Sequence, residues 1–220
     1  MPHRSDPATQ KIGDPKECYQ VSKFKDDKPV HALPKPFDDC VDDLGSFIKI
    51  PESEGGKNWF SDRHAYDIPS GDILRILHYP PVESHIDDIR AGSHTDYGSI
   101  TLVFQHDIGG LEIYAGRSRW ISAPVIPDCI LVNLGDCLEF WTNGLLKSTL
   151  HRVVFRSNTQ SLDRHSMVYF CEGYDIPLDP VPSRLVPGDE VKMGESGKRM
   201  TAAEHLRMRL DASLAYYVNR

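Results

Sequence analysis

Three side chains of the types that bind metal ions form the most informative pattern in this sequence. His94 and Asp96 stand two positions apart, and His151 opens a later apolar run, His-Arg-Val-Val-Phe. Two imidazoles and one carboxylate are the ligands of the facial triad, which holds Fe(II) on one side and leaves other positions open for substrate, cosubstrate and dioxygen. The three residues therefore predict a non-haem Fe(II) site.

A second pattern, an arginine and a serine two positions apart, follows the last of these ligands. The guanidinium of Arg164 offers a planar fork of N–H donors that matches a carboxylate, and the hydroxyl of Ser166 adds another hydrogen bond. The pair is suited to bind the distal carboxylate of a small acid. Taken together, the triad and this pair suggest an iron-dependent oxygenase.

Extended segments can bring these side chains to one place. Side chains at i and i+2 point to the same side of a strand, so His94 and Asp96 can reach one metal ion. His151 and Arg164 each share a strand face with apolar residues further along. Inner faces that are polar at one end and apolar at the other fit the interior of a β-barrel or jelly roll.

Short strand-like runs, separated by turn signals such as Gly109-Gly110, predict an all-β architecture. We therefore predict a mainly β fold whose core is a double-stranded β-helix, that is, a cupin-like jelly roll. The predicted strands cover residues 73–79, 99–104, 111–114, 129–134, 149–156 and 164–172.

The segments outside this core carry weaker signals. Residues 1–36 are rich in proline and charge and predict an extended lead, and residues 37–220 predict a single domain with its core near 71–173. A short helical stripe indicates an N-terminal helix at 37–48, and Pro and Gly indicate a loop at 175–199. A C-terminal helix over 201–218, opened by a capping box of Thr201 and Glu204, is expected on the barrel exterior.

Each candidate residue also has an ordinary structural interpretation. A second His-x-Asp, His85 to Asp87, lies in a proline-rich run followed by Asp88 and Arg90, and we interpret it as a solvated loop rather than a strand entrance. A lone histidine on an apolar face is more often a core residue, and a lone arginine more often forms a surface ion pair. The joint spacing of the candidates favours the metal site over these separate interpretations.

Longer stretches around these residues resemble a known family. The runs that start at His94 (His-Thr-Asp-Tyr-Gly-Ser-Ile-Thr-Leu), Asn133 (Asn-Leu-Gly-Asp), Trp141 (Trp-Thr-Asn-Gly) and Arg164 (Arg-His-Ser-Met) resemble the isopenicillin N synthase-like family of Fe(II)/2-oxoglutarate dioxygenases. By that resemblance the iron ligands are His94, Asp96 and His151, and the residues that bind the cosubstrate are Arg164, Ser166 and Tyr79.

The resemblance implies an enzyme, an oxidoreductase that uses Fe(II), 2-oxoglutarate and O2. It would hydroxylate, desaturate or cyclise a small organic metabolite and release succinate and CO2. Leu77 stands at an Asn position of the family, and Phe140 stands where many relatives carry Arg. The family's early strands and much of its helical backing are shortened here. That difference would leave one sheet face poorly covered and favour self-association.

Three alternatives stay open. The first is an Fe(II) oxidase of the same fold that does not use 2-oxoglutarate, in which Arg164 and Ser166 bind a substrate carboxylate. The second is a truncated, non-catalytic relative that keeps the ligands but lacks a complete substrate wall. The third is a jelly-roll protein that uses Zn or Mn for hydrolysis or isomerisation, which the Arg-x-Ser pair disfavours.

Composition agrees with one soluble, cytoplasmic domain. A chain of 220 residues with 40% hydrophobic and 26% charged residues can bury a sizeable core without disulfides. The net charge of -7 argues against nucleic acid or an anionic membrane as a partner, and no apolar stretch is long enough to span a bilayer. The five cysteines lack Cys-x-x-Cys spacing, which favours reduced thiols. We expect Cys129, Cys137 and Cys171 to be small core residues.

Overall fold

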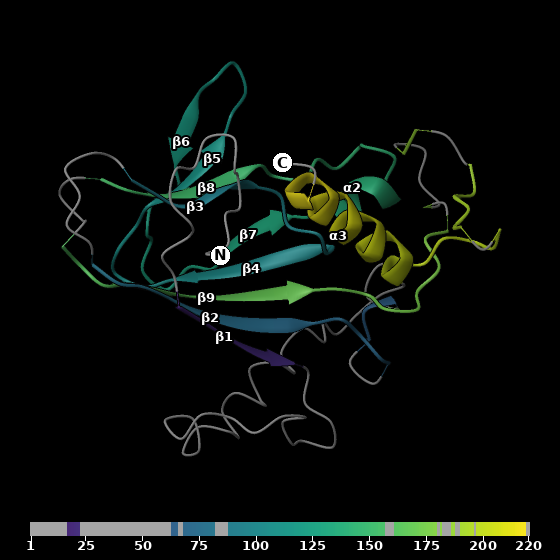
Figure 1. Ribbon diagram of the computed structural model, residues 1–220, viewed down its shortest axis with the longest axis horizontal. Coiled ribbons are helices and arrows are strands. Elements are labelled where there is room, and N and C mark those ends of the chain that lie inside the picture. The colour runs from purple at the N-terminus through teal and green to yellow at the C-terminus, as the bar shows by residue number, and fades with distance from the viewer. Residues whose placement is uncertain are drawn as a thin grey trace.

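The computed structural model describes residues 17–22, 63–65, 68–81, 88–156, 161–179, 181, 186–187, 190–195 and 197–218. These residues form two antiparallel sheets and the helices α2 (Asp136–Trp141) and α3 (Ala202–Val218) (Figure 1). The larger sheet, in spatial order, contains β1 (Glu17–Ser22), β2 (Ile73–Tyr79), β9 (Arg164–Cys171), β4 (Ile100–Gln105) and β7 (Leu131–Leu134). The smaller sheet contains β3 (Asp88–His94), β8 (His151–Phe155), β5 (Leu111–Tyr114) and β6 (Trp120–Ser122).

The two sheets pack their inner faces against each other around a shared apolar cluster. Both sheets contribute to it, so the core lies between them rather than on one side. This arrangement is the mainly β, jelly-roll fold that the strand spacing predicts. The buried core residues are Leu77, Tyr79, Val103 and Val168 of the larger sheet, Ala91, Leu111, Val153 and Phe155 of the smaller sheet, and Ala123 after β6.

Strand register decides which side chains face the interior. Along β9, Arg164, Ser166 and Val168 are buried while the residues between them are exposed. Tyr79 of β2 lies opposite Arg164, and Gln105 of β4 lies opposite Ser166. Because side chains opposite one another point to the same sheet face, the register places the polar end of β9 and Tyr79 on one wall.

All the predicted strands are present, with ends that differ by no more than two residues, but four elements were not predicted. The expectation that no strand follows Asp87 is wrong, because β3 begins at Asp88. Its sequence, Asp-Ile-Arg-Ala-Gly-Ser-His, does not alternate, and its pairing with β8 contains two register shifts. β1 lies inside the predicted lead and pairs with β2, and β6 and α2 are too short to show a period.

The C-terminal part of the chain agrees with the predictions made for it, among the residues that the structure describes. The capping box is confirmed, since the Thr201 N–H donates to Glu204 Oε2 at 3.0 Å and the Glu204 N–H donates to Thr201 Oγ1 at 3.2 Å. Between 175 and 199 the described residues form no helix or strand, only isolated bridges such as Pro177 with Thr201. The helix predicted at 37–48 lies outside the described residues.

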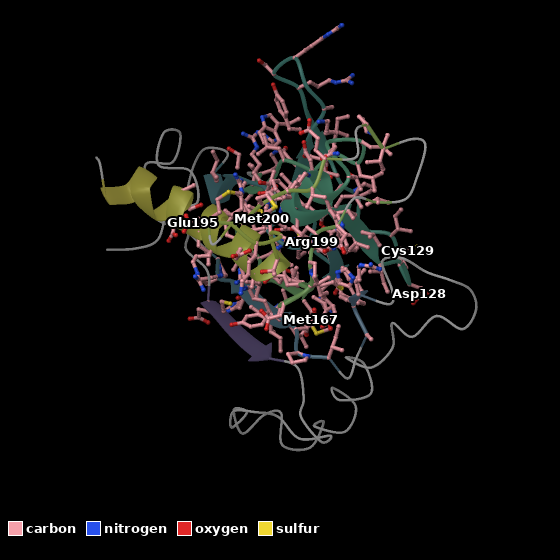
Figure 2. The ribbon with its side chains drawn as sticks, turned by 90° about the vertical axis from the view of Figure 1, so that its right-hand side faces the viewer. Asp128, Cys129, Met167, Glu195, Arg199 and Met200 are labelled. Carbon is pink, nitrogen blue, oxygen red and sulfur yellow. The ribbon has the colours of Figure 1, made fainter. Side chains whose placement is uncertain are left out.

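The cysteine prediction is correct for one residue. Cys137 is buried and Cys171 is half-buried, but Cys129 is exposed. Cys129 follows Asp128 in a turn before β7, where its N–H donates to the Ile126 carbonyl, and this turn holds the side chain away from the core (Figure 2). Neither described helix has the length and apolar character of a membrane span.

Two carboxyl groups lie close together where β2 begins and β9 ends. Asp72 accepts hydrogen bonds from the Glu172 backbone N–H at 2.8 Å and from the Tyr169 hydroxyl at 3.1 Å. Burial and the charge of Asp72 raise the pKa of Glu172 to about 7. Glu172 therefore keeps its proton in the folded protein at pH values where the unfolded chain has lost it.

We predict that Glu172→Gln stabilises the protein at high pH and not at low pH. The folded state of the natural chain binds more protons between pH 4.5, the ordinary pKa of a glutamate, and about 7, so its stability falls as pH rises through that window. At about pH 8 the variant should gain roughly 2 kcal/mol in urea unfolding, and at about pH 4 the gain should vanish. An equal gain at both pH values, or the same pH-dependent gain in the control Glu195→Gln, would contradict the assignment.

Candidate metal centre

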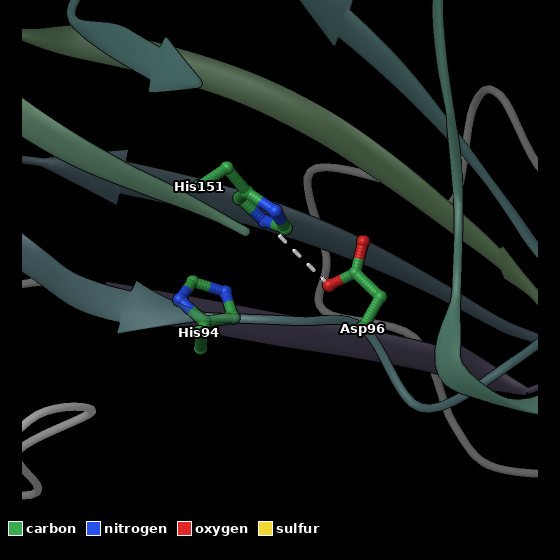
Figure 3. A group of neighbouring side chains, drawn as sticks. All are labelled: His94, Asp96 and His151. Carbon is green, nitrogen blue, oxygen red and sulfur yellow. Dashed lines mark ion pairs between the residues drawn. The ribbon is translucent and has the colours of Figure 1, made fainter. Parts of the chain in front are cut away.

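The three predicted ligands come together at one end of the smaller sheet. His94 ends β3, Asp96 follows in the turn toward β4, and His151 begins β8. The histidines lie opposite each other in the β3–β8 pairing, with ring centroids 4.4 Å apart. The potential ligand atoms of all three residues lie within 4.8 Å of one another, and the side chains point toward one another (Figure 3).

Backbone carbonyls orient both imidazoles in the same way. His94 Nδ1 lies 2.7 Å from the Gly92 carbonyl oxygen, and His151 Nδ1 lies 2.8 Å from the Thr149 carbonyl oxygen. Each Nδ1 can only donate to a carbonyl, so it carries the proton and leaves the Nε2 lone pair for a metal ion. These carbonyls are the partners that fix the tautomers, and sequence reasoning did not identify them.

Asp96 is the buried anion of the group. Burial on its own would raise the pKa of Asp96, but the neighbouring His151 and His94 and a hydrogen bond from Asn133 outweigh it and hold that pKa below its ordinary value. Asn133 Nδ2 donates to Asp96 Oδ2 at 2.8 Å. Asp96 Oδ1 lies 3.7 Å from His151 Nε2, too far for a hydrogen bond. Two neutral nitrogens and one carboxylate oxygen thus converge as the donor set of a facial triad does.

The turn that carries Asp96 is held from behind by both helices. Asp136, the first residue of α2, accepts a hydrogen bond from the Thr95 hydroxyl at 3.1 Å and pairs with Arg209 of α3 at 2.7 Å. The hydroxyls of Tyr97 and Ser213 are 2.7 Å apart. Helix α3, expected only to pack on the exterior, therefore supports both residues that flank Asp96.

Arg164 and Ser166 line the same cavity as the triad. Arg164 is almost completely buried, and its burial lowers the pKa of the guanidinium. Its Nε donates to the Gly109 carbonyl at 2.9 Å, and its Nη1 donates to Ser166 Oγ at 3.3 Å. Gly110, at φ +115°, leaves no room for a Cβ, which would lie 2.8 Å from the carbonyl oxygen of Val154. Gly110 thus permits the close approach to Val154, directly after the Gly109 carbonyl that orients Arg164.

The other residues singled out from the sequence divide between the cavity and its surroundings. Tyr79 lines the cavity, with its ring centroid 5.1 Å from Arg164 Cζ, and Leu77 lines it as an apolar residue. Phe140 instead packs on His205 of α3, with ring centroids 4.8 Å apart. The second His-x-Asp at 85–87 lies outside the described residues.

Two polar residues at the cavity were not assigned a role from the sequence. Asn133 belongs to the Asn-Leu-Gly-Asp run, but only the structure shows that it donates to Asp96. Arg75 also lines the cavity. It stands four residues before Tyr79, so the alternation of a strand could have placed it on the same face.

Comparison with known proteins agrees with this geometry. Residues 70–173 match the family described as the 2OG-Fe(II) oxygenase superfamily. The Schizosaccharomyces pombe UPF0676 protein C1494.01 is 34% identical over 94% of this chain and 67% of its own length. Homoarginine-6-hydroxylase 2-ODD-C23 of Glycine max is 39% identical over 59% of this chain, which spans only 41% of that enzyme.

A solved structure extends the likeness to nearly the whole chain. A full-length Neurospora crassa protein, crystallised in complex with alpha-KG, superposes with a TM-score of 0.70 at 30% identity, over 94% of this chain and 69% of that protein. The family match covers the residues that carry the candidate ligands, and two of these relatives match 94% of this chain. The chain belongs to the 2OG-Fe(II) oxygenase superfamily.

Proposed function

We propose that this protein is a non-haem Fe(II)- and 2-oxoglutarate-dependent dioxygenase that oxidises a small organic metabolite. His94, Asp96 and His151 would hold the iron. The main support is that these three residues and the Arg164–Ser166 pair line a single cavity, although they come from separate parts of the chain. The triad fits a metal ion, and the Arg164–Ser166 pair fits a carboxylate.

The residues around the cosubstrate would bind and orient it. Arg164, Ser166 and Tyr79 would hold the far carboxylate of 2-oxoglutarate, because the Gly109 carbonyl fixes Arg164 Nε and leaves the outer N–H groups directed at the cavity. Apolar neighbours such as Val153 exclude water between the two polar ends. When bound, Fe(II) with 2-oxoglutarate and O2 would supply the oxidising chemistry, with release of succinate and CO2.

The proposed substrate class is a small molecule. Relatives carry names such as homoarginine-6-hydroxylase and proline hydroxylase, and the Neurospora crassa protein has also been crystallised with thymine. These compounds differ in chemistry but share a small size. We propose no nucleic-acid or membrane partner, since the net charge is -7. A cytoplasmic location, favoured by cysteines without Cys-x-x-Cys spacing, stays a prediction.

We predict that titration of the purified protein with Fe(II) and then 2-oxoglutarate under argon produces a visible charge-transfer band. His151→Ala should abolish the band because it removes an iron ligand. Arg164→Ala should raise the 2-oxoglutarate concentration needed for half of the band by about tenfold or more, since it removes a charge-assisted pair. Arg119→Gln, which removes the same charge from an exposed turn, is the control.

Each other outcome favours a different alternative. Iron binding without a band, with O2 consumed and no succinate formed, would favour the oxidase that does not use 2-oxoglutarate. A band without O2 consumption across a broad substrate panel would favour the non-catalytic relative. Absence of Fe(II) binding would contradict the assignment of the triad.

We predict that Asn133→Ala weakens Fe(II) binding by about tenfold. This is the smallest effect expected when a residue that hydrogen-bonds a metal ligand is removed. Asn133 donates to Asp96 Oδ2, so its loss frees the carboxylate to rotate and raises the pKa of Asp96. Competition with a coloured chelator measures the affinity. Gln105→Ala removes another amide from the same sheet and is the matched control. Unchanged iron affinity in Asn133→Ala would contradict this role.

We propose self-association of two copies through a poorly covered face of the larger sheet at β7, which is an edge strand among the described residues. Val132 on this strand is 55% exposed, and an apolar edge strand favours pairing with another chain. Sedimentation velocity should show a concentration-dependent dimer that Val132→Lys weakens and that Ile121→Lys, at an exposed site on the other sheet, leaves intact. A monomer at every concentration would contradict this proposal.

A further inference from the structure

A second guanidinium group lines the cavity at a distance from Arg164. Arg75 lies on β2, on the inner face that it shares with Leu77 and Tyr79. In the β2–β9 pairing Tyr79 is opposite Arg164, whereas Arg75 is opposite Val168. Four residues of extended strand separate the two positions, roughly 13 Å along the sheet. The two arginines therefore lie at different ends of the cavity.

The side chain of Arg75 extends away from Arg164 and toward the metal ligands. Its Cζ lies 5.0 Å from the centroid of the Phe170 ring. Phe170 stands in the same row of the larger sheet as Asn133, which is the hydrogen-bond donor to Asp96. Arg75 and Phe170 thus form a wall beside the ligands, on the side that Arg164 does not reach.

The charge of Arg75 is not required by the cosubstrate. The net charge of the site is already zero without Arg75 when both histidines are neutral. The positive charges of Fe(II) and Arg164 balance the negative charges of Asp96 and the two carboxylates of 2-oxoglutarate. Glu172 is an acidic neighbour of Arg75. The positive charge of Arg75 opposes the rise in the pKa of Glu172. A guanidinium carries five N–H donors around its plane, so it can contact Glu172 and still donate into the cavity.

We propose that Arg75 binds a carboxylate of the primary substrate and that the Phe170 ring packs against the apolar part next to it. The inference rests on the proposed function, since that function assigns Arg164 to the cosubstrate. A planar fork of donors matches a carboxylate in two parallel hydrogen bonds, and a partly desolvated cavity strengthens the pair. The substrate class is therefore a small organic acid.

The test compares acids with neutral molecules of the same shape. Enzyme saturated with Fe(II) and 2-oxoglutarate under argon is titrated with 2-naphthoate and cyclohexanecarboxylate and with their primary carboxamides, and the shift of the charge-transfer band gives each Kd. Wild type should bind each acid about ten- to a hundredfold more tightly than its amide. Arg75→Gln should reduce this preference to about threefold or less, and Arg75→Lys, which keeps the charge without the fork, should fall between them.

Cosubstrate binding provides the internal control. The 2-oxoglutarate affinity should stay within about threefold of wild type in both Arg75 variants and in Arg119→Gln, which also reports that the site is folded. The inference is overturned if Arg75→Gln keeps the acid preference, if it weakens 2-oxoglutarate as much as the acids, or if no acid shifts the band. A wild type that forms no band with 2-oxoglutarate would instead overturn the proposed function, and this inference with it.

Discussion

The pairing of β3 with β8 is the constraint on which the candidate site depends. His94 lies opposite His151 in this pairing, so the imidazoles meet only when the strands keep their register. A slip by one residue would turn the ligands of one strand to the opposite face of the sheet. The same geometry gives each imidazole the carbonyl two residues before it in the chain as an acceptor. The positions of both histidines therefore follow from one strand pair, and their tautomers follow from the backbone next to each of them.

The cavity holds two buried charges of opposite sign, and neutral dipoles stabilise each of them. Asp96 accepts a hydrogen bond from Asn133, and Arg164 donates to the Gly109 carbonyl and to Ser166. An unpartnered charge in such a place would cost several kcal/mol. Because the fold itself supplies these partners, we expect ligand binding to require little rearrangement of the protein.

The sequence predicted the parts of this structure that are periodic. The first five residues of β9 alternate between buried and exposed, and the inner residues Arg164 and Ser166 were identified together. β3 was missed because Gly, Ser and two register shifts break the alternation that identifies a strand. The role of Asn133 and that of the Gly109 carbonyl could not be predicted, since they depend on contacts between segments far apart in the chain.

Different parts of the chain support the turn that carries Asp96 and form the walls of the cavity. Asp136 joins Thr95 to Arg209, so both helices hold the turn on the side away from the cavity. Arg75 and Phe170 lie on the strands of the larger sheet and face inward. Because the two sets are built on different elements, the wall residues can change without displacing the ligands. In the proposed enzyme, the geometry of the metal centre would thus stay fixed while the wall determined which molecule is oxidised.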